Sequence, residues 1–342
     1  MRAFRAVTAG AVAATVAVAA GCGGGADTAQ PRTQPLKVGL AFDAGGRGDR
    51  SFNDAAAAGV DEALRNMRGM RVKEVPAEQG EPAGRKVERV RALAKAGYDP
   101  VIAVGESYAP ALRLVAPRFP HTRFAILDDP AVSGPNVTNL LFAEEQGSFL
   151  MGAAAAMTSR TGDVGFVGGE RSAPARRLEA GYVQGVKHVN RQARIRIAYV
   201  GGHHDLGGAG NPESAHGAVR RMCRAGSDVI YQVDAASGAG VFRAAKEAGV
   251  WAIGSGHDHA LSADPAVRGV ILTSMVKRLD VAVYDYLADI EDGTVTSGPV
   301  TYDLKLGGVD YSLTGGHIKG IQPRLEQLKQ EIIHGRFKVS PG

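Results

Sequence analysis

From Leu36 onward, the hydrophobic pattern alternates between two kinds of segment. Short runs rich in Val, Ile and other apolar residues are separated by longer segments whose apolar positions recur three and four residues apart. Runs that are apolar throughout are typical of strands buried on both faces of a parallel sheet, and the longer segments are typical of the helices that cover it. We therefore predict strands at 37–42, 70–75, 100–104, 123–127, 137–142, 163–167, 195–200, 228–233, 250–253 and 270–274.

The amphipathic segments between these strands predict the helices. They lie at 52–67, 84–96, 108–116, 145–159, 175–190, 212–225, 241–248 and 277–290. Regular alternation of strands and helices indicates an α/β fold with doubly wound parallel sheets. The strands fit two sheets better than one, with the seam around residues 143–161.

The pattern changes after Lys277. Residues 299–311 form an extended run with a Gly-Gly break, and residues 323–334 read as a helix with Pro at its start and Gly335 as its stop. Such a tail can pass back across both halves. We predict two hinged lobes, the first from 36–143 plus about 275–303 and the second from 144–274 plus about 304–342.

The N-terminus reads as an export signal, residues 1–21. Arg2 and Arg5 precede the uncharged run 6–20, and small residues precede Cys22. This order resembles a bacterial lipobox, in which the Cys is acylated; the alternative is an ordinary secreted protein. The run is too short for a membrane-spanning helix. We predict an exported protein, lipid-anchored at Cys22 to the outer face of the bacterial cytoplasmic membrane by a flexible tether, residues 22–35.

Charge and motifs argue against several other functions. The net charge is +5, but the basic residues are scattered and form no stripe with interleaved aromatics, which argues against nucleic-acid binding. No G-x-S-x-G, Walker lysine or H-E-x-x-H motif occurs, so we predict no enzyme and no cofactor. The histidines at 203–204 and 257–259 raise a metal hypothesis. Alternate residues of an extended segment point apart, so we predict no metal site.

Candidate binding residues follow the strands. Open parallel sheets bind ligands beyond the carboxyl ends of their strands. Small residues, acids, an amide and an aromatic gather there in both halves: Asp43, Ser51, Phe52, Asn53, Gly105, Tyr108, Asp128, Asp234, Ser237, Gly238, Asp258 and Lys277. This set suits a small polar ligand with a flat ring, because carboxylates accept hydrogen bonds and an aromatic face stacks.

Several of these residues also have a purely structural interpretation. Ser51 and Asp54 fit a capping box at the start of a helix, where Phe52 can pack beneath the first turn. Tyr108 fits a packed helix residue, Asp128 and Asp258 can cap turns, and Lys277 can pair with Asp280 on a solvated helix face.

Five motifs together resemble a known family. They are D-x-G-G-x-x-D-x-S-F-N at 43–53, EEQGSFLMGAAAA at 144–156, VGFVGG at 164–169, VIYQVDAASGAGVFRAAKEAG at 229–249 and LTSMVKRLDVAVYDYL at 272–287. In this order they resemble the basic membrane protein (BMP) lipoproteins, whose best-understood members are purine-nucleoside receptors of ABC importers. The resemblance runs from about Leu36 to Val339.

The resemblance implies a fold, a ligand and partners. The fold would be the two-lobed type I periplasmic-binding fold, and the partners an ABC permease and ATPase. A purine nucleoside would lie in the cleft, with its base stacked on Phe52 and bonded to Asp43 and Asn53. The ribose hydroxyls would meet Asp258 and Lys277, and the loop of Ser237 and Gly238 would line the pocket.

The sequence departs from the family at two loops. The usual A-G-G-T-G is D-A-A-S-G from Asp234, and the usual G-V-D-S-D-Q is G-S-G-H-D-H from Gly254. An acid is thus missing at Gly256, another is new at Asp234, and two histidines are new. These departures keep two alternatives open: a ligand other than a nucleoside, and a surface receptor that senses its ligand without transport.

Overall fold

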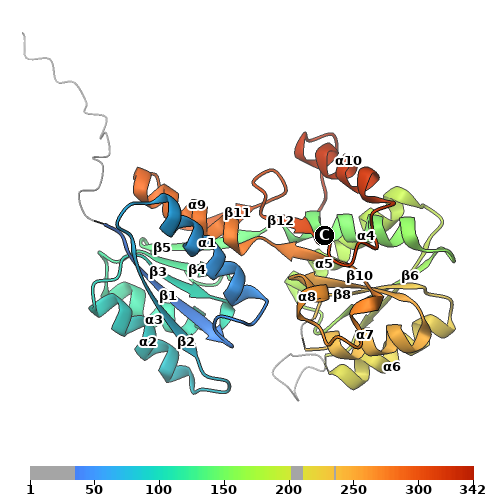
Figure 1. Ribbon diagram of the computed structural model, residues 1–342, viewed down its shortest axis with the longest axis horizontal. Helices are drawn as coiled ribbons and strands as arrows, with labels where there is room; N and C mark the ends of the chain where they lie inside the picture. The colour runs from blue at the N-terminus through green and yellow to red at the C-terminus, as the bar shows by residue number, and fades with distance from the viewer. Residues whose placement is uncertain (1–34, 202–210, 235) are drawn as a thin grey trace, which may run out of the picture.

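The computed structural model describes residues 35–201, 211–234 and 236–342, which form two α/β lobes side by side (Figure 1). This confirms the predicted fold class of two parallel-sheet lobes. The predicted signal, Cys22 and nearly all of the tether lie outside the described residues, as does the 203–205 histidine segment.

Lobe 1 is built on a six-stranded parallel sheet with the order β11-β5-β4-β3-β1-β2. Its strands are β1 Lys37–Ala44, β2 Arg71–Ala77, β3 Val101–Val104, β4 Phe124–Leu127, β5 Val137–Phe142 and β11 Gly298–Tyr302. Its helices are α1 Phe52–Asn66, α2 Ala83–Lys95, α3 Ala109–Val115 and α9 Leu279–Asp292, with 3-10 turns η1 Glu106–Tyr108 and η2 Ala116–Arg118. The central strands β3 and β4 are buried throughout, as their apolar sequences predict.

Lobe 2 repeats this plan with the order β12-β10-β9-β8-β6-β7, in which the short β12 alone is antiparallel. Its strands are β6 Asp163–Gly168, β7 Arg194–Tyr199, β8 Val229–Gln232, β9 Trp251–Gly256, β10 Ile271–Lys277 and β12 Val309–Tyr311. Its helices are α4 Glu144–Thr158, α5 Ala173–Val189, α6 Pro212–Arg224, α7 Gly238–Ala248, α8 His259–Ser262 and α10 Gln322–Ile333, with the 3-10 turn η3 Arg268–Val270.

The chain crosses between the lobes three times: from β5 to α4, from β10 to α9, and from β11 to β12. The middle crossing lies slightly later than the boundary predicted at about residue 275. Met275, Val276 and Lys277 pair with β12, so they still belong to the second sheet. Lys277 is therefore the last residue of lobe 2 before the chain returns to lobe 1.

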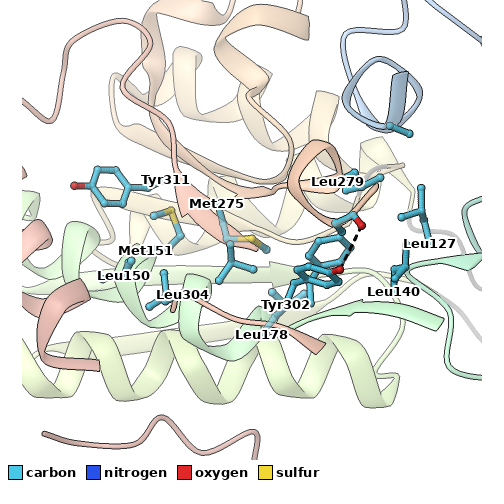
Figure 2. Close-up of a cluster of buried hydrophobic side chains, with 14 of the residues drawn as sticks. Leu127, Leu140, Leu150, Met151, Leu178, Met275, Leu279, Tyr302, Leu304 and Tyr311 are labelled. Carbon is cyan, nitrogen blue, oxygen red and sulfur yellow. Dashed lines mark hydrogen bonds between the residues drawn. The ribbon is translucent and has the colours of Figure 1, made fainter. Parts of the chain in front are cut away.

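One hydrophobic core runs through these crossings (Figure 2). It includes Leu127 and Leu140 of lobe 1 and Leu150 of lobe 2, with Leu279 and Tyr302 from the crossing segments. The Tyr302 hydroxyl donates to the carbonyl oxygen of Ala282 at 3.3 Å. The hinge is therefore packed with apolar side chains.

Two pairs of helices approach each other closely at glycine residues. An added Cβ at Gly152 of α4 would lie 2.1 Å from the carbonyl oxygen of Tyr182 on α5, and one at Gly59 of α1 would lie 2.4 Å from that of Asp280 on α9. Only glycine permits these approaches. In the described part of the chain, none of the helices combines the length and apolar character needed to cross a bilayer.

Candidate functional site

A pocket of about 560 Å³ lies between the lobes. It is located at the carboxyl ends of β9 and β10 and at the start of α1, where an open α/β sheet is expected to bind its ligand. Four of the predicted binding residues line it: Ser51, Phe52, Asp258 and Lys277. The pocket is also lined by Arg50, Asp54, Ala55, Gly256, His257, Leu261, Arg268 and Val276.

The turn before α1 is organised by Asp49. Its carboxylate accepts hydrogen bonds from the backbone N–H groups of Ser51, Asn53 and Asp54, at 2.8–3.1 Å. The predicted capping box of Ser51 and Asp54 is wrong, because the Ser51 side chain makes no cap hydrogen bond. Asp49 satisfies the helix N-terminus instead, and this leaves the Ser51 hydroxyl free for the cleft.

Ser51 and His257 join the two lobes. Ser51 Oγ lies 3.1 Å from Nδ1 of His257, and Nε2 of the same ring lies 2.9 Å from Ser262 Oγ. The ring also lies against His259, with 4.0 Å between centroids. Burial lowers the pKa of His257, against the opposing charge of Asp258, so the imidazole is neutral at pH 7.

Lys277 sits between two carboxylates. Its Nζ lies 2.6 Å from Asp128 Oδ2 of lobe 1 and 2.5 Å from Glu144 Oε1 of α4, and its side chain is 9% exposed. Burial disfavours the ammonium, but the charges of Asp128 and Glu144 outweigh burial and raise the pKa of Lys277. Burial raises the pKa of Asp128, and Lys277 opposes this effect. The lysine is therefore a buried cation with its charge already compensated.

The Phe52 ring lies beside Lys277 and Gly256 of lobe 2. Lys277 Nζ is 5.6 Å from the centroid of the Phe52 ring, within the range of a cation–π contact. From the other lobe, Gly256 approaches the ring: an added Cβ would lie 3.4 Å from Phe52 Cε1. Gly256 has φ +91°, a conformation that favours glycine.

Asp43 and Asn53 hold the end of β1. The Asn53 amide accepts from the N–H of Asp43 at 3.0 Å and donates to the carbonyl oxygens of Asp43 and Ala44. The Asp43 carboxylate accepts from Lys86 at 2.7 Å and from Ser107 at 2.9 Å. Burial opposes ionisation of Asp43, but these donors outweigh it and lower its pKa. In this conformation both residues lie outside the pocket lining, and their contact with a ligand stays a prediction.

Gly105 and Tyr108 also lie outside the lining. Gly105 has φ +89° and follows β3, close to Asp43. Tyr108 is fully buried, and its hydroxyl donates to the carbonyl oxygen of Phe42 at 2.7 Å. Burial raises its pKa to about 12. Tyr108 is thus a core residue of lobe 1 rather than part of the cleft surface, in agreement with the structural interpretation.

The loop after β8 is stabilised by its own side chains. The Asp234 carboxylate accepts from the N–H of Ser237 at 2.9 Å, which makes Asp234 a turn residue. Gly238 begins α7 beside the Gln232 side chain. Ser237 is buried, and its hydroxyl has no hydrogen-bond partner among the described residues.

Asp258 both caps a helix and lines the pocket. One carboxylate oxygen accepts from the N–H of Ala260 at 3.0 Å, as the first residue before α8 should. The other accepts from the Thr314 hydroxyl at 2.5 Å, which ties the segment after β12 to the site. The structural interpretation of Asp258 as a cap is therefore confirmed, and it leaves less of the carboxylate for a ligand.

Backbone strain marks the same region. Arg50 and Asp128 are the non-glycine residues with positive φ in the described ranges, at +52° and +65°. Residues held in this conformation cost free energy and cluster at functional sites. Arg50 lines the pocket and Asp128 binds Lys277, so both strained positions adjoin the cleft.

The sequence prediction missed Glu144, which pairs with Lys277, and several residues that line the pocket. Glu144 begins an apolar helix, and its carboxylate was not expected to pair with a lysine over one hundred positions away. Arg50 and Arg268 are not defining residues of any sequence motif that indicates a binding role, so the sequence gives no signal for them. His257 was noticed as a departure from the family, and that departure was the available signal. Among the described residues, no group of three His, Cys, Asp or Glu side chains could hold a metal ion.

Because His257 is neutral in the closed form, we predict that closure of the lobes depends on pH. A histidine whose pKa is lowered in the closed form stabilises that form above its ordinary pKa of about 6.5, and the contribution is lost as the pH falls through the lowered value. Ligand affinity and thermal stability should therefore fall as the pH is lowered below about 6.5.

His257→Gln keeps polar atoms near Ser51 but does not titrate, so it should flatten this dependence. The test is the thermal unfolding midpoint at each pH. The neighbouring His259, whose pKa burial lowers to about 4, adds to the same loss of stability below about pH 6.5, so His257→Gln should reduce the slope without abolishing it. An equal slope in both proteins would show that His257 is not the titrating group.

Comparison with known proteins agrees with this geometry. The model of the Bmp family, described as ABC transporter substrate-binding protein PnrA-like, matches residues 36–340. The ABC transporter nucleoside-binding protein BmpA of Lactococcus lactis is 30% identical, with 95% of each chain covered. An uncharacterized lipoprotein of Pyrococcus abyssi is 30% identical over 86% of this chain and 74% of its own.

A solved structure agrees as well. The crystal structure of an ABC transporter system solute-binding protein from Aeropyrum pernix superposes with a TM-score of 0.67 at 28% identity, over 90% of this chain and 94% of that one. With a family model spanning nearly the whole folded part, the chain belongs to the Bmp family of PnrA-like substrate-binding proteins of ABC transporters.

Proposed function

We propose that this protein binds a purine nucleoside between its lobes, without turning it over, and delivers it to an ABC permease and ATPase. The observation that carries the proposal is the Phe52 ring, which lies in an interlobe pocket of about 560 Å³ beside Lys277 and His257. That volume falls within the range of pockets that hold small ligands. The name of the Lactococcus relative, a nucleoside-binding protein, supports the same ligand class.

Each pocket residue offers the ligand a different kind of contact. Phe52 offers an aromatic face on which a base can stack, while Asp258 and Lys277 offer an acceptor and a donor to hydroxyl groups. The Ser237 hydroxyl of lobe 2 is buried without a partner in the described structure and lies outside the pocket lining, so its contact with a ligand stays a prediction. No bond needs to be made or broken by any of them.

Closure supplies the signal for transport. Ser51 contacts His257 and Asp128 contacts Lys277 across the lobes, so the closed form already has contacts of its own. A ligand favours this form only by the additional contacts it makes there. The membrane partner would then recognise the closed pair of lobes.

Calorimetry with adenosine, guanosine, inosine, cytidine and the free bases tests the ligand class. We expect saturable binding of at least one purine nucleoside with a stoichiometry of one, and weaker binding of the matching free base. If every nucleoside in the panel gave no heat and no change in thermal stability, the proposed ligand class would be wrong.

We propose further that the mature protein is anchored through a lipid on Cys22. The sequence before Cys22 and the lipoprotein name of the Pyrococcus relative support this location. Cells expressing the protein should incorporate labelled palmitate into it, and Cys22→Ser should abolish the label. Full labelling of the Cys22→Ser protein would argue for another attachment site.

A further inference from the structure

We infer that the outer end of the interlobe pocket is an anion site made by Arg50 and Arg268, and that the preferred ligand is a nucleoside monophosphate. This inference rests on the proposed function, because the phosphate site shares the pocket with Phe52. Both arginines line the pocket, Arg50 from lobe 1 and Arg268 from lobe 2. An anion held between them would therefore bridge the lobes.

The two guanidinium groups converge on one segment. Arg50 Nη1 lies 3.5 Å from the carbonyl oxygen of Leu261, and Arg268 Nε donates to the carbonyl oxygen of Ala263 at 2.6 Å. These carbonyls are two residues apart at the end of α8, so both guanidiniums bind the same short segment of lobe 2. The contact of Arg50 is long for a hydrogen bond and is easily exchanged for a better acceptor.

Neither guanidinium has a carboxylate partner in the described ranges of the chain. Some arginines elsewhere are paired, such as Arg47 with Asp61 and Glu74 and Arg89 with Glu81. A guanidinium carries five N–H donors in a planar fork that matches phosphate or carboxylate oxygens. Arg50 and Arg268 thus retain most of their donors for a ligand.

The two acids of the pocket have other partners. Asp54 accepts from the backbone N–H groups of Gly48 and Arg50, at 2.7 and 2.9 Å. Asp258 accepts from Ala260 N–H and from Thr314. Their charges are partly satisfied by these donors, which weakens the repulsion of an anion.

Charge also differs between the two ends of the pocket. At the inner end, the single cation of Lys277 is matched by two carboxylates, so an anion gains nothing there. At the outer end, the guanidiniums of Arg50 and Arg268 form no ion pair in the described structure, and the nearby Asp54 and Asp258 accept from other donors. A ligand with a neutral ring and one anionic group therefore fits in one orientation, with its ring on Phe52 and its anion outward.

The backbone holds Arg50 in position for this role. Its φ of +52° is unusual for an arginine, and Asp54 fixes this conformation by accepting its N–H at 2.9 Å. Arg50 lies two residues before Phe52 in the same turn. The sugar substituent of a ring stacked on Phe52 is thus within reach of the Arg50 side chain.

The test compares a nucleoside with its own 5′-monophosphate. Calorimetry at low salt would use adenosine, guanosine and inosine, each paired with its 5′-monophosphate, and inorganic phosphate alone. We expect at least one monophosphate to bind about 10-fold or more tightly than its nucleoside, the gain typical of hydrogen bonds to a charged group. Added salt should reduce this preference.

Substitutions of the two arginines test whether they bind the anion. Arg50→Ala and Arg268→Ala should each reduce the monophosphate-to-nucleoside affinity ratio about 10-fold, whereas Arg65→Ala at the far end of α1 should leave the ratio unchanged. Arg50→Lys keeps the charge without the fork and should retain part of the preference. Thermal unfolding checks that each variant is folded.

The outcomes separate this inference from the proposed function. Nucleosides that bind as tightly as their monophosphates, or an affinity ratio unchanged in both alanine variants, would overturn the anion site and leave the proposed function standing. Inorganic phosphate that binds equally well to the wild type and the alanine variants would also overturn it. If none of the nucleosides or monophosphates bound, both proposals would be wrong.

Discussion

Replacing Lys277 with methionine is expected to lower the free energy of unfolding by about 3–5 kcal/mol, the cost typical of removing one partner from a buried ion pair. Methionine matches the length of the side chain, but the carboxylates of Asp128 and Glu144 lose their shared cation. The two acids would then repel each other in a buried site. Chemical denaturation at pH 7.5 measures the loss.

The sign of the pH dependence makes this test specific. Without the ammonium, the pKa of Asp128, already raised by burial, should rise further. A carboxyl group whose pKa is raised in the folded state destabilises that state above this pKa and ceases to do so once both states are protonated. The deficit of Lys277→Met should therefore shrink as the pH falls from 7.5 toward 4.

Two controls accompany this variant. Lys305→Met removes an exposed lysine and should leave the stability almost unchanged. Lys277→Met combined with Asp128→Asn and Glu144→Gln should recover part of the loss, because no charge then stays buried. A deficit that is the same at pH 4 and pH 7.5 would mean that lost packing, not uncompensated charge, causes the effect.

Phe52→Ala is expected to weaken ligand binding by about 1–3 kcal/mol, or roughly 5- to 150-fold, by analogy with measured base–aromatic stacking. The reason is that the Phe52 ring lines the pocket and offers a phenyl face for a base. Its side chain is only partly buried, so the fold should tolerate the change. Isothermal calorimetry with the tightest-binding ligand measures the effect.

Phe52→Tyr and Phe52→Leu serve as matched controls. Tyrosine keeps the flat ring and should keep most of the affinity, whereas leucine keeps apolar area without a ring and should lose much of it. Affinity that is unchanged in Phe52→Ala would place the ring of the ligand elsewhere in the cleft.

The fold was largely predictable from sequence because its signals are local. Each buried strand is a short apolar run, and helix α6 begins where Asn211 accepts from two backbone N–H groups ahead of Pro212. The observed strands and helices start and end within a few residues of the predicted bounds. The pattern was also sufficient to predict that the tail returns across both lobes.

The site was less predictable because its contacts are distant in sequence. Lys277 was considered as a partner of Asp280, but Asp280 pairs with Arg278 at 2.7 Å, and Lys277 reaches Asp128 and Glu144 instead. The first turn of α1 offered two acids and a serine as caps, and local pattern alone could not show that Asp49 is used. Which charges meet across the cleft depends on how the lobes are oriented.

The three crossings make both lobes depend on the last quarter of the chain. Strand β11, near residue 300, completes the first sheet by covering β5, and β12 completes the second by pairing with β10. A nascent chain that ends before Gly298 therefore has an open strand edge in its N-terminal half, although most of that half has long been synthesised. A nonsense mutation before Gly298 would therefore remove one strand from each sheet at once.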